Sequence, residues 1–338
     1  MPTGPIVLDS VVTARAFNSN DEDAVLDLLQ AAFGTWPRDM SGVSASEFFR
    51  WKHLDAPFGP SALVVAEADG LIVGFVAYMP WRFKARGRPV LSLRGTDLAV
   101  HPAYRRRGVS VALRRESKVS SEFSFIWSNP NVHSRPGQRK VGRRPVRVLA
   151  QFVQPRAQIA RTAARAYAGR SRTPRYLSVQ AEPAERVIDD DLLKGLTDHA
   201  GQAGDRLATD KTVDYLHWRY GRFDDYRAVR IDTGGAPRGL AIFRCRLYGS
   251  YWVSHICELL VERGDQRAVR QLLGRVRDAA PVDIIRCCFR SHAQAAAHGF
   301  FDYRSRSLLT TAPLQPNIEP DPGRPDSWAL SGGDLELL

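Results

Sequence analysis

The sequence has little cysteine and no long hydrophobic run, and both shortages exclude classes of protein. Its four cysteines, Cys245, Cys257, Cys287 and Cys288, lie in apolar segments without a C-x-x-C pair, so we expect buried thiols and no metal site. The longest apolar stretch, residues 71–81, is too short to span a bilayer. We find no charged segment followed by an apolar one at the N-terminus, so a secretory signal is not expected. We therefore expect a cytoplasmic protein with no membrane partner.

Lysine is also scarce, supplying six of the 48 basic residues of a chain with a formal net charge of +12. That charge suits nucleic-acid binding, because Lys and Arg neutralise phosphates. An Arg-rich, Lys-poor chain is also what a GC-rich coding sequence produces, and no known nucleic-acid module is present. We expect no nucleic-acid partner. The 338 residues suit two domains of ordinary size.

The hydrophobic pattern of the first half predicts alternating strands and helices. Residues 11–17 read as a strand, and a helix from about Asp21 carries an apolar stripe. A short helix near residues 48–51 precedes a hairpin turning at Asp69 and Gly70. A strand ending at Val100, a helix, and further strands and helices follow. This order predicts an α+β (α/β mixed) fold, a mixed twisted sheet flanked by helices.

Residues 97–113, DLAVHPAYRRRGVSVAL, form the most informative segment. An apolar strand, a proline bend and a basic turn ending in Gly108 precede an amphipathic helix. This layout directs backbone N–H groups and a helix N-terminus to one point, which is a receptor for a pyrophosphate. The alternative is an exposed basic turn. The predicted phosphate-binding residues are Arg105, Arg106, Arg107, Gly108, Val109 and Ser110.

Apart from Ser110, residues 105–110 fit the signature Arg/Gln-x-x-Gly-x-Gly/Ala, and the chain resembles the GNAT superfamily of acyl-CoA-dependent N-acyltransferases. The resemblance implies that this turn holds the pyrophosphate of acyl-CoA. It also implies that the backbone of Leu98, Ala99 and Val100 pairs with the pantetheine arm and offers an N–H to the thioester oxygen.

Residues 131–142 resemble the family segment Asn-x-x-Ala-x-x-x-Tyr-x-Lys-x-Gly, which implies that Asn131 and Ser134 also contact the cofactor. In the family that Tyr commonly protonates the leaving thiolate, and Gln138 takes its place here. A thiol with a pKa of roughly 8–9 is already a fair leaving group. Catalysis with solvent or another residue as the acid is therefore plausible.

The second half repeats the first at low similarity, in four anchors of the same order. Residues 49–52, 72–76, 97–100 and 140–142 correspond to residues 216–219, 238–242, 258–261 and 297–299. This pattern predicts two tandem GNAT folds, similar to mycothiol synthase and to acyltransferases of amino sugars and lipoglycopeptide antibiotics. After Val261 the second copy lacks the glycine signature and carries acidic side chains, which oppose an anion. We expect one acyl-CoA per chain.

The predicted domains follow from these anchors. An N-terminal GNAT domain with the acyl-CoA site spans residues 8–155, and a basic linker helix spans 156–175. A degenerate C-terminal GNAT domain on the acceptor side spans 176–312. Residues 313–338 are rich in Pro and Gly and suit an extended or disordered tail.

The sequence offers three candidates for the catalytic base. Asp97 and Glu258 stand where the family often carries a carboxylate base, or each is a structural hydrogen-bond acceptor. His199 follows an Asp and suits amine deprotonation, or it lies at a solvated helix end. Trp36 and Trp81 are candidates for acceptor binding, or they are core residues.

The resemblance thus implies an acyl-CoA-dependent N-acyltransferase that acylates a primary amine of an amino sugar or an amino-sugar-bearing natural product such as a glycopeptide antibiotic. Transfer is expected to be direct, in a ternary complex, because no nucleophile with an adjacent base is evident. The expected partner is the small-molecule amine, with no metal, and the protein is a monomer or homodimer. The alternatives are an aminoglycoside-type resistance N-acetyltransferase and a non-catalytic acyl-CoA-binding protein.

Overall fold

The chain forms two compact units. The computed structural model describes residues 11–37, 42–116, 121–157, 159–160, 162–163, 177–188, 196, 204–223, 225–289 and 291–335. Unit 1 comprises residues 1–81, 91–144 and 310–315, and unit 2 comprises residues 82–90, 145–309 and 316–338. These boundaries differ from the predicted ones, because the tip of one hairpin and the tail belong to unit 2.

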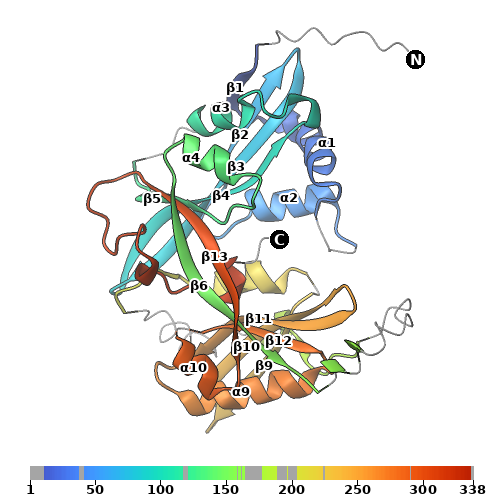
Figure 1. The fold of residues 1–338 in the computed structure, drawn as a ribbon, viewed down its shortest axis with the longest axis vertical. Coiled ribbons are helices and arrows are strands. Elements are labelled where there is room, and N and C mark those ends of the chain that lie inside the picture. Colours follow the sequence, from blue (N-terminus) through green and yellow to red (C-terminus); the bar gives the residue numbers. More distant parts are fainter. Residues whose placement is uncertain are drawn as a thin grey trace. The chain divides into compact units, whose positions relative to one another are not determined.

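Unit 1 is a mixed sheet flanked by helices (Figure 1). Its strand order is β1-β2-β3-β4-β5-β13, with β4 and β5 parallel and β5 antiparallel to β13. The elements are β1 Thr13–Ala16, α1 Glu22–Phe33, α2 Ala45–His53, β2 Ala62–Ala68, β3 Leu71–Ala85, β4 Arg88–Val100, α3 Val109–Glu116, β5 Phe125–Ser128, α4 Arg135–Lys140 and the end of β13 Phe301–Pro313.

Local sequence explains the first elements of unit 1. Asn18 opens the helical segment with a capping box, and its side chain accepts from the Asn20 amide at 2.9 Å. The β2–β3 turn falls on Asp69 and Gly70, both with positive φ, as an Asp-Gly hairpin requires. The predicted order of strands and helices is confirmed.

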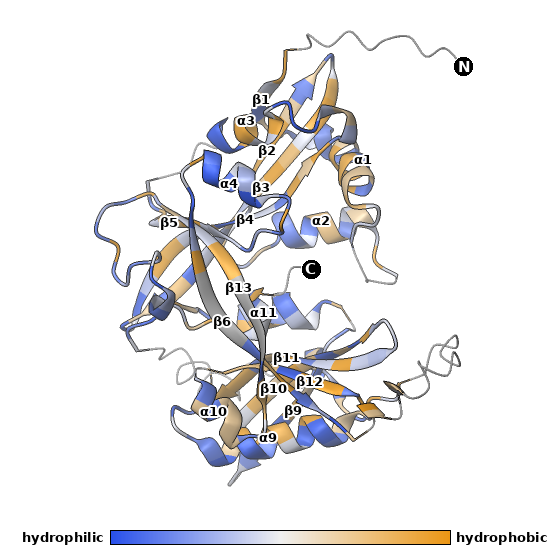
Figure 2. Cartoon of the chain, viewed as in Figure 1, coloured by the Kyte–Doolittle hydropathy of each residue, from blue (hydrophilic) through white to orange (hydrophobic). Residues whose placement is uncertain are grey.

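Helices cover both faces of this sheet. Phe75 of β3 contacts Phe49 of α2 with ring centroids 6.1 Å apart. The neighbouring Gly74 faces the other side, where a Cβ would lie 2.8 Å from Val109 Cγ1 and 3.0 Å from Leu113 Cδ1 of α3. Glycine therefore lets α3 approach the sheet closely. Figure 2 shows that β2 and β3 are largely hydrophobic, whereas α4 is largely hydrophilic.

Unit 2 repeats the order of the strands and helices from β1 to α4 of unit 1, with a short added strand and an added turn and helix at its end. Its main strands follow the order β6-β12-β11-β10-β9-β7, with β11 and β12 parallel. The elements are β6 Arg144–Pro155, β7 Glu182–Pro183, α6 Ala184–Val187, β8 Ala208–Thr209, α8 Val213–Leu216, the π-helical turn η3 His217–Gly221, β9 Arg227–Thr233, β10 Ala236–Tyr248, β11 Tyr251–Val261, α9 Gln266–Ala279, β12 Ile284–Cys288, α10 His292–Ala297, the 3-10 turn η4 Pro325–Ser327 and α11 Gly332–Leu335. The chain is thus α+β, with two mixed sheets flanked by helices.

Two of the predicted anchors can be checked against this duplication. Gly142 follows α4 with φ 77° and Gly299 follows α10 with φ 75°, so their predicted correspondence agrees with the structure. The predicted alignment also placed Gly74 opposite Leu240, which is wrong by one residue. Gly239 is the equivalent, because a Cβ there would lie 3.0 Å from Leu272 Cδ1 of α9.

The tail is not extended or disordered in its described part. Trp328 is 3% exposed, and the residues of α11 are buried in unit 2. The prolines of the tail do not prevent the burial of Trp328. Its indole N–H donates to the Pro322 carbonyl at 3.0 Å, and its ring lies 5.5 Å from that of Phe83 between centroids. Within the described ranges, no helix combines the length and the apolar character needed to cross a membrane.

Replacing Gly74 by Val should destabilise unit 1 by about 2–3 kcal/mol, because the side chain overpacks the α3 interface. Hydrogen exchange of peptides from β2 and β3 would report the change. Gly274→Ala in α9 is the control, because no side chain of the described residues lies within 4 Å of its Cβ position and alanine favours helix. Unchanged exchange in Gly74→Val would contradict the assigned packing.

Candidate functional site

The turn before α3 presents unused backbone donors. Arg106 and Gly108 have φ values of 67° and 83°. The amides of Val111 and Ala112 donate to the Gly108 carbonyl at 2.8 and 3.0 Å, whereas among the described residues the amides of residues 108–110 have no acceptor. Apart from its chain neighbours, no atom of the described residues lies within 4 Å of a Cβ built on Gly108. An open helix N-terminus with free N–H groups is a receptor for a phosphate.

Three exposed arginines surround this turn. Arg105 donates to the carbonyls of Val100 and Ala32, each at 3.4 Å. The guanidinium of Arg107 lies 5.2 Å from the centroid of the Tyr104 ring. Arg105, Arg106 and Arg107 have no carboxylate partner within the described ranges. Their charge is therefore available to an anion.

Strands β4 and β5 part just beside this turn. Ser92 to Arg94 pair with Phe125 to Trp127, but β4 continues to Val100 while β5 ends at Ser128. At Gly95 a Cβ would lie 2.7 Å from Ser128 Oγ. Residues 98–100, predicted to receive the pantetheine arm, have no partner on β5 in the described register. The parting leaves one backbone edge of β4 open to an extended ligand.

Asp97 is the anchor of that parting. Its φ of 48° marks an irregularity in β4. Its carboxylate lies 2.8 Å from Lys52 Nζ and 3.0 Å from His53 Nε2, both from α2. His53 Nδ1 lies 3.1 Å from Ser61 Oγ. Although burial alone would raise it, the charge of Lys52 and the hydrogen bond from His53 hold the pKa of Asp97 well below its usual range.

This pairing favours the structural role of Asp97 over that of a base. A carboxylate with a strongly lowered pKa is a poor proton acceptor at neutral pH. Burial also lowers the pKa of His53, so the buried imidazole is neutral at neutral pH and its hydrogen bonds orient the carboxylate.

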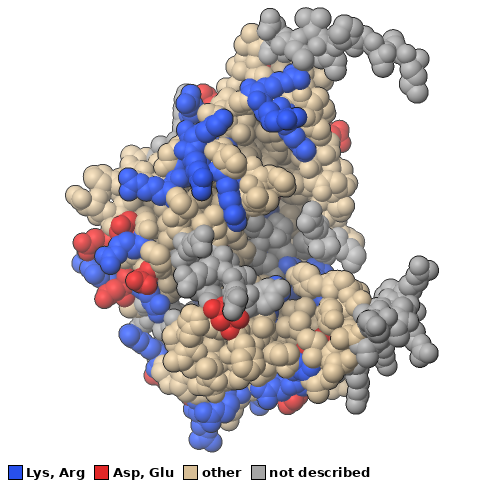
Figure 3. Space-filling view, viewed as in Figure 1, with Lys and Arg blue, Asp and Glu red and all other residues tan. Residues whose placement is uncertain are grey.

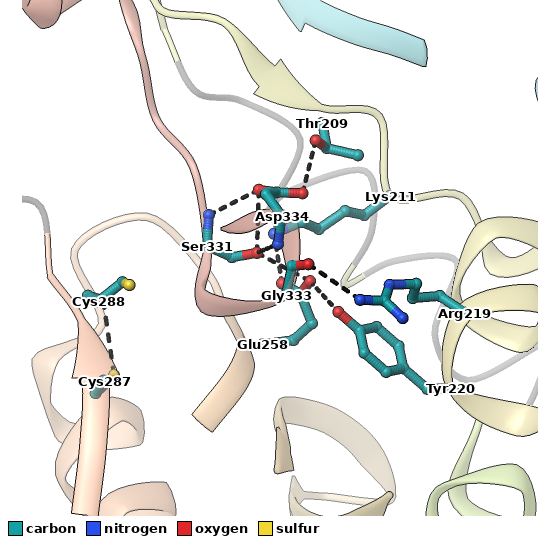
Figure 4. Close-up of polar contacts among 10 residues, drawn as sticks. All are labelled: Thr209, Lys211, Arg219, Tyr220, Glu258, Cys287, Cys288, Ser331, Gly333 and Asp334. Carbon is teal, nitrogen blue, oxygen red and sulfur yellow. Dashed lines mark hydrogen bonds and ion pairs between the residues drawn. The ribbon is translucent and has the colours of Figure 1, made fainter. Parts of the chain in front are cut away.

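Glu258 is held in the same way in unit 2 (Figure 4). Its carboxylate accepts from Tyr220 at 2.6 Å and from Ser331 at 3.0 Å, and it forms a buried ion pair with Lys211. Burial raises the pKa of Glu258. Burial alone would lower the pKa of Lys211, but the charge of Glu258 raises it. These bonds engage the Glu258 carboxylate within the unit.

Lys52, His53 and Tyr220 were not among the predicted site residues. The repeat held a signal for them, because Trp51-Lys52-His53 corresponds to Trp218-Arg219-Tyr220 at the first anchor. The correspondence matches His53 with Tyr220, and each of these side chains contacts a buried carboxylate. That carboxylate belongs to Asp97 in one unit and to Glu258 in the other.

In unit 2, a side chain occupies the position that corresponds to the phosphate receptor. The Asp265 carboxylate caps α9 by accepting from the Ala268 amide at 2.9 Å, and Arg238 Nε donates to it at 2.7 Å. Hydrogen bonding from Arg238 holds the pKa of Asp265 below its usual range. A side-chain anion thus occupies the place of a phosphate. This supports the expectation of one acyl-CoA per chain.

In unit 2, β11 pairs with β12 at residues 253–255, and the tail packs against β11 just beyond that pairing. A Cβ on Gly332 would lie 2.4 Å from the Ile256 carbonyl oxygen, and one on Gly333 would lie 1.9 Å from the Tyr220 hydroxyl. A cavity of about 770 Å³ remains beside this contact, with Lys211 and Glu258 in its lining. These lining charges pair with each other (Figure 4).

A buried cationic cluster lies between α3 and α4 in unit 1. Arg143 donates to Ser128 Oγ at 2.8 Å and to the Tyr78 hydroxyl at 3.3 Å. Burial and the nearby charge of Arg143 lower the pKa of Arg114 to about 10. Gln138, in the position of the family's Tyr, is 6% exposed, and its Oε1 has no partner among the described residues. These polar groups border the parting of β4 and β5.

The predicted loop residues Asn131 and Ser134 support each other. The Ser134 amide donates to Asn131 Oδ1 at 2.9 Å, and Ser134 Oγ donates to the Asn131 carbonyl at 3.2 Å. These bonds shape the turn that begins α4. The side chains of Asn131 and Ser134 therefore stabilise the conformation of this segment.

The two tryptophans predicted for acceptor binding are core residues. Trp36 is 7% exposed and contacts the Phe48 ring edge-on at 5.0 Å between centroids. Trp81 is 2% exposed, and its ring lies 5.7 Å from Trp127, with the Arg94 guanidinium 4.9 Å from its centroid. Neither ring has an exposed face for an acceptor, because each is buried by its neighbours. His199 and most of the predicted linker helix lie outside the described residues.

Comparison with known proteins relates this geometry to acyl transfer. Residues 13–119 match the family model described as "Acetyltransferase (GNAT) domain", and this span contains the turn before α3. No curated protein matches the sequence.

The solved structures that resemble this chain align with residues of both units. A GCN5-related N-acetyltransferase from Anabaena variabilis is 13% identical over 89% of this chain and 72% of its own, with a TM-score of 0.62. N-myristoyltransferase from Saccharomyces cerevisiae with bound myristoyl-CoA is 14% identical over 100% of this chain and 89% of its own, with a TM-score of 0.56. A probable N-acyltransferase from Enterococcus faecalis reaches 0.62 at 14% identity, over 90% of this chain and 73% of its own. The likeness shows the fold, and with the domain match it supports an N-acyltransferase of GNAT type.

Asp97→Asn should destabilise unit 1 by about 3–5 kcal/mol, because it leaves the buried Lys52 ammonium without its counter-charge. The matched control is Glu67→Gln, which removes a half-exposed partner of Arg15 and should cost under about 1 kcal/mol. Urea unfolding followed by hydrogen exchange of β4 peptides measures both. Equal effects of the two variants would exclude the anchoring role.

Acid should weaken unit 1 through His53. Its folded pKa lies below the ordinary value of about 6.5, so the unfolded chain binds a proton that the folded unit does not. The stability contribution is present above that ordinary value and is lost as the pH falls below it. Melting temperatures from pH 7.5 to 5.5 should fall less in His53→Gln, whereas the exposed control His292→Gln should keep the full slope.

Proposed function

We propose that unit 1 binds one acyl-CoA and that the protein transfers its acyl group to a primary amine, as an N-acyltransferase of the tandem GNAT type. The observation that carries the proposal is the open N-terminus of α3 beside the parting of β4 and β5, where the amides of residues 108–110 have no acceptor among the described residues. The turn takes the pyrophosphate, and the open edge of β4 takes the pantetheine arm.

Transfer proceeds directly between the two substrates. The amine nitrogen attacks the thioester carbonyl, a C–N bond forms, and the C–S bond then breaks to release the CoA thiolate. A backbone N–H of residues 98–100 stabilises the oxyanion, as the family resemblance implies. The amine loses its proton to a base before or during attack.

The base is not one of the two buried carboxylates in this proposal. Asp97 and Glu258 are each engaged by a lysine and an aromatic or imidazole side chain. His199 remains the proposed base, since an imidazole with a pKa near 6.5 suits amine deprotonation at neutral pH. Comparing the pH profile of kcat/KM for the native chain and His199→Gln tests this assignment.

The buried cations replace the missing acid of the family segment. Gln138 cannot protonate a thiolate. Arg143 and Arg114 place positive charge between α3 and α4, beside the parting strands. A developing thiolate is stabilised by such a charge without proton transfer. Arg143→Met should therefore lower kcat more for a poor thiol leaving group than for an activated aryl thioester.

The acceptor is the amine of an amino sugar or of an amino-sugar-bearing natural product, and its support is the sequence resemblance. We propose that the reaction takes place in the cytoplasm and that the protein is a monomer or homodimer. Thiol release from acetyl-, octanoyl- and palmitoyl-CoA with a panel of amino sugars, glycopeptides and aminoglycosides tests donor and acceptor together. Acyl-CoA binding without turnover on any amine would favour the non-catalytic alternative.

Placing an acid at the phosphate receptor should abolish acyl-CoA binding. Ser110→Glu imitates the closed turn of unit 2, and an acid in the first turn of α3 does not oppose folding, because it suits the helix dipole. We expect at least about a tenfold rise in the acyl-CoA Kd by calorimetry. Gln266→Glu, in the first turn of α9, is the matched control and should leave the Kd unchanged. Equal Kd values for all three proteins would contradict the assigned receptor.

A further inference from the structure

A basic surface extends from the phosphate receptor across helices α3 and α4 of unit 1. Residues 98–155 contain twelve Lys and Arg but only two acids, Glu116 and Glu122. Figure 3 shows Lys and Arg side chains gathered over α3, α4 and the turn before α3. The exposed cations of this α3–α4 basic surface are Arg105, Arg106, Arg107, Arg115, Arg135, Arg139, Lys140 and Arg144.

These cations are not neutralised within the described part of the chain. None of the eight has an ion pair with a described acid. Some exposed arginines elsewhere in the described chain do have one: Arg50 lies 3.2 Å from Glu22, and Arg86 lies 3.0 Å from Asp205. Clustered like charges repel each other unless a partner compensates them. The surface therefore suits a polyanionic partner.

The nucleotide of CoA accounts for only part of this surface. Its pyrophosphate and 3′-phosphate carry about four negative charges. Arg115 lies six residues after Val109 in α3, which places it about 9 Å further along the helix axis than Val109. Arg135, Arg139 and Lys140 belong to a different helix, α4. The cations outnumber the charges of the nucleotide and extend beyond its receptor.

The surface borders the parting of β4 and β5. Helix α4 contacts the first turn of α3, since a Cβ on Gly137 would lie 3.3 Å from Ser110 Oγ. A partner on this surface thus lies beside the slot that takes a pantetheine arm. Nucleic acid matches the charge but has no group for that slot, whereas an acidic protein with a phosphopantetheine thioester matches both.

We propose that the α3–α4 basic surface docks an acidic acyl carrier protein, whose phosphopantetheine arm delivers the acyl thioester into the parting of β4 and β5. The inference rests on the proposed function for its slot and chemistry. The amine–carbonyl C–N bond forms, the C–S bond to the carrier's phosphopantetheine breaks, the carrier leaves as its thiolate, and the amine proton passes to the base. Charge complementarity speeds the encounter and sets the orientation.

The test compares two donors. An acidic bacterial acyl carrier protein and CoA are each loaded with the same octanoyl group, and transfer is measured on the amine that serves best with either. The variant Arg135→Gln/Arg139→Gln/Lys140→Gln removes three charges from α4, and glutamine is itself a good helix former. The control Arg263→Gln/Arg267→Gln/Arg270→Gln removes three exposed charges at and before α9 in unit 2.

We expect the α4 variant to raise KM for the carrier-bound donor at least about tenfold and to flatten its dependence on salt. KM for octanoyl-CoA should change less than about threefold, and the control should match the native chain with both donors.

Four results would overturn the proposal. Transfer from octanoyl-CoA but none from the carrier would leave the proposed function standing without the docking surface. Equal losses for both donors would assign the surface to the CoA nucleotide. Salt-sensitive RNA binding that the α4 variant loses and the carrier does not displace would assign it to nucleic acid. No transfer from either donor would contradict both proposals. Transfer from the carrier alone would support the docking surface and would replace acyl-CoA by the acyl carrier protein as the donor.

Discussion

The buried contact of Asp97 with Lys52 and His53 is the constraint on which the donor site depends. It ties α2 to the irregular point of β4, just where β4 stops pairing with β5. A buried ion pair of this kind is costly to break, because loss of one partner leaves the other charge desolvated. The open edge of β4 is therefore held apart by a contact on the opposite side of the sheet from α3. In the second unit, Glu258 has the same relation to Tyr220.

Both units contain this buried carboxylate contact, but they differ at the N-terminus of the helix that follows the strand. Unit 1 leaves the amides at the start of α3 unbonded, whereas unit 2 caps α9 with the Asp265 carboxylate. Unit 2 also brings Gly332 against the backbone of β11. One duplicated arrangement of elements thus gives an open receptor in one unit and a self-filled one in the other. The physical difference is the source of the anion, a ligand phosphate in the proposal and a side chain in unit 2.

The local parts of the site could be predicted from the sequence. The turn at residues 105–110 follows from Gly108, the arginines and the amphipathic pattern of α3, because a helix N-terminus needs only neighbouring residues. The partners of Asp97 could not be read directly, since Lys52 and His53 lie more than forty residues away. The burial of Trp36 and Trp81 was equally hidden, because an aromatic in a strand or helix looks the same whether its face is covered or open.

The sequence alone determined the alternation of strands and helices, the basic turn, the duplication and the absence of a second glycine signature. These depend on periodicity and on contacts between near neighbours. Only the tertiary structure decided that the two predicted carboxylates are anchored, that the proline-rich tail is buried in unit 2, and that the cations of α3 and α4 form one surface. Each of these depends on which distant side chains exclude water from a group, and burial decides whether a charge is paired, shifted or left for a partner.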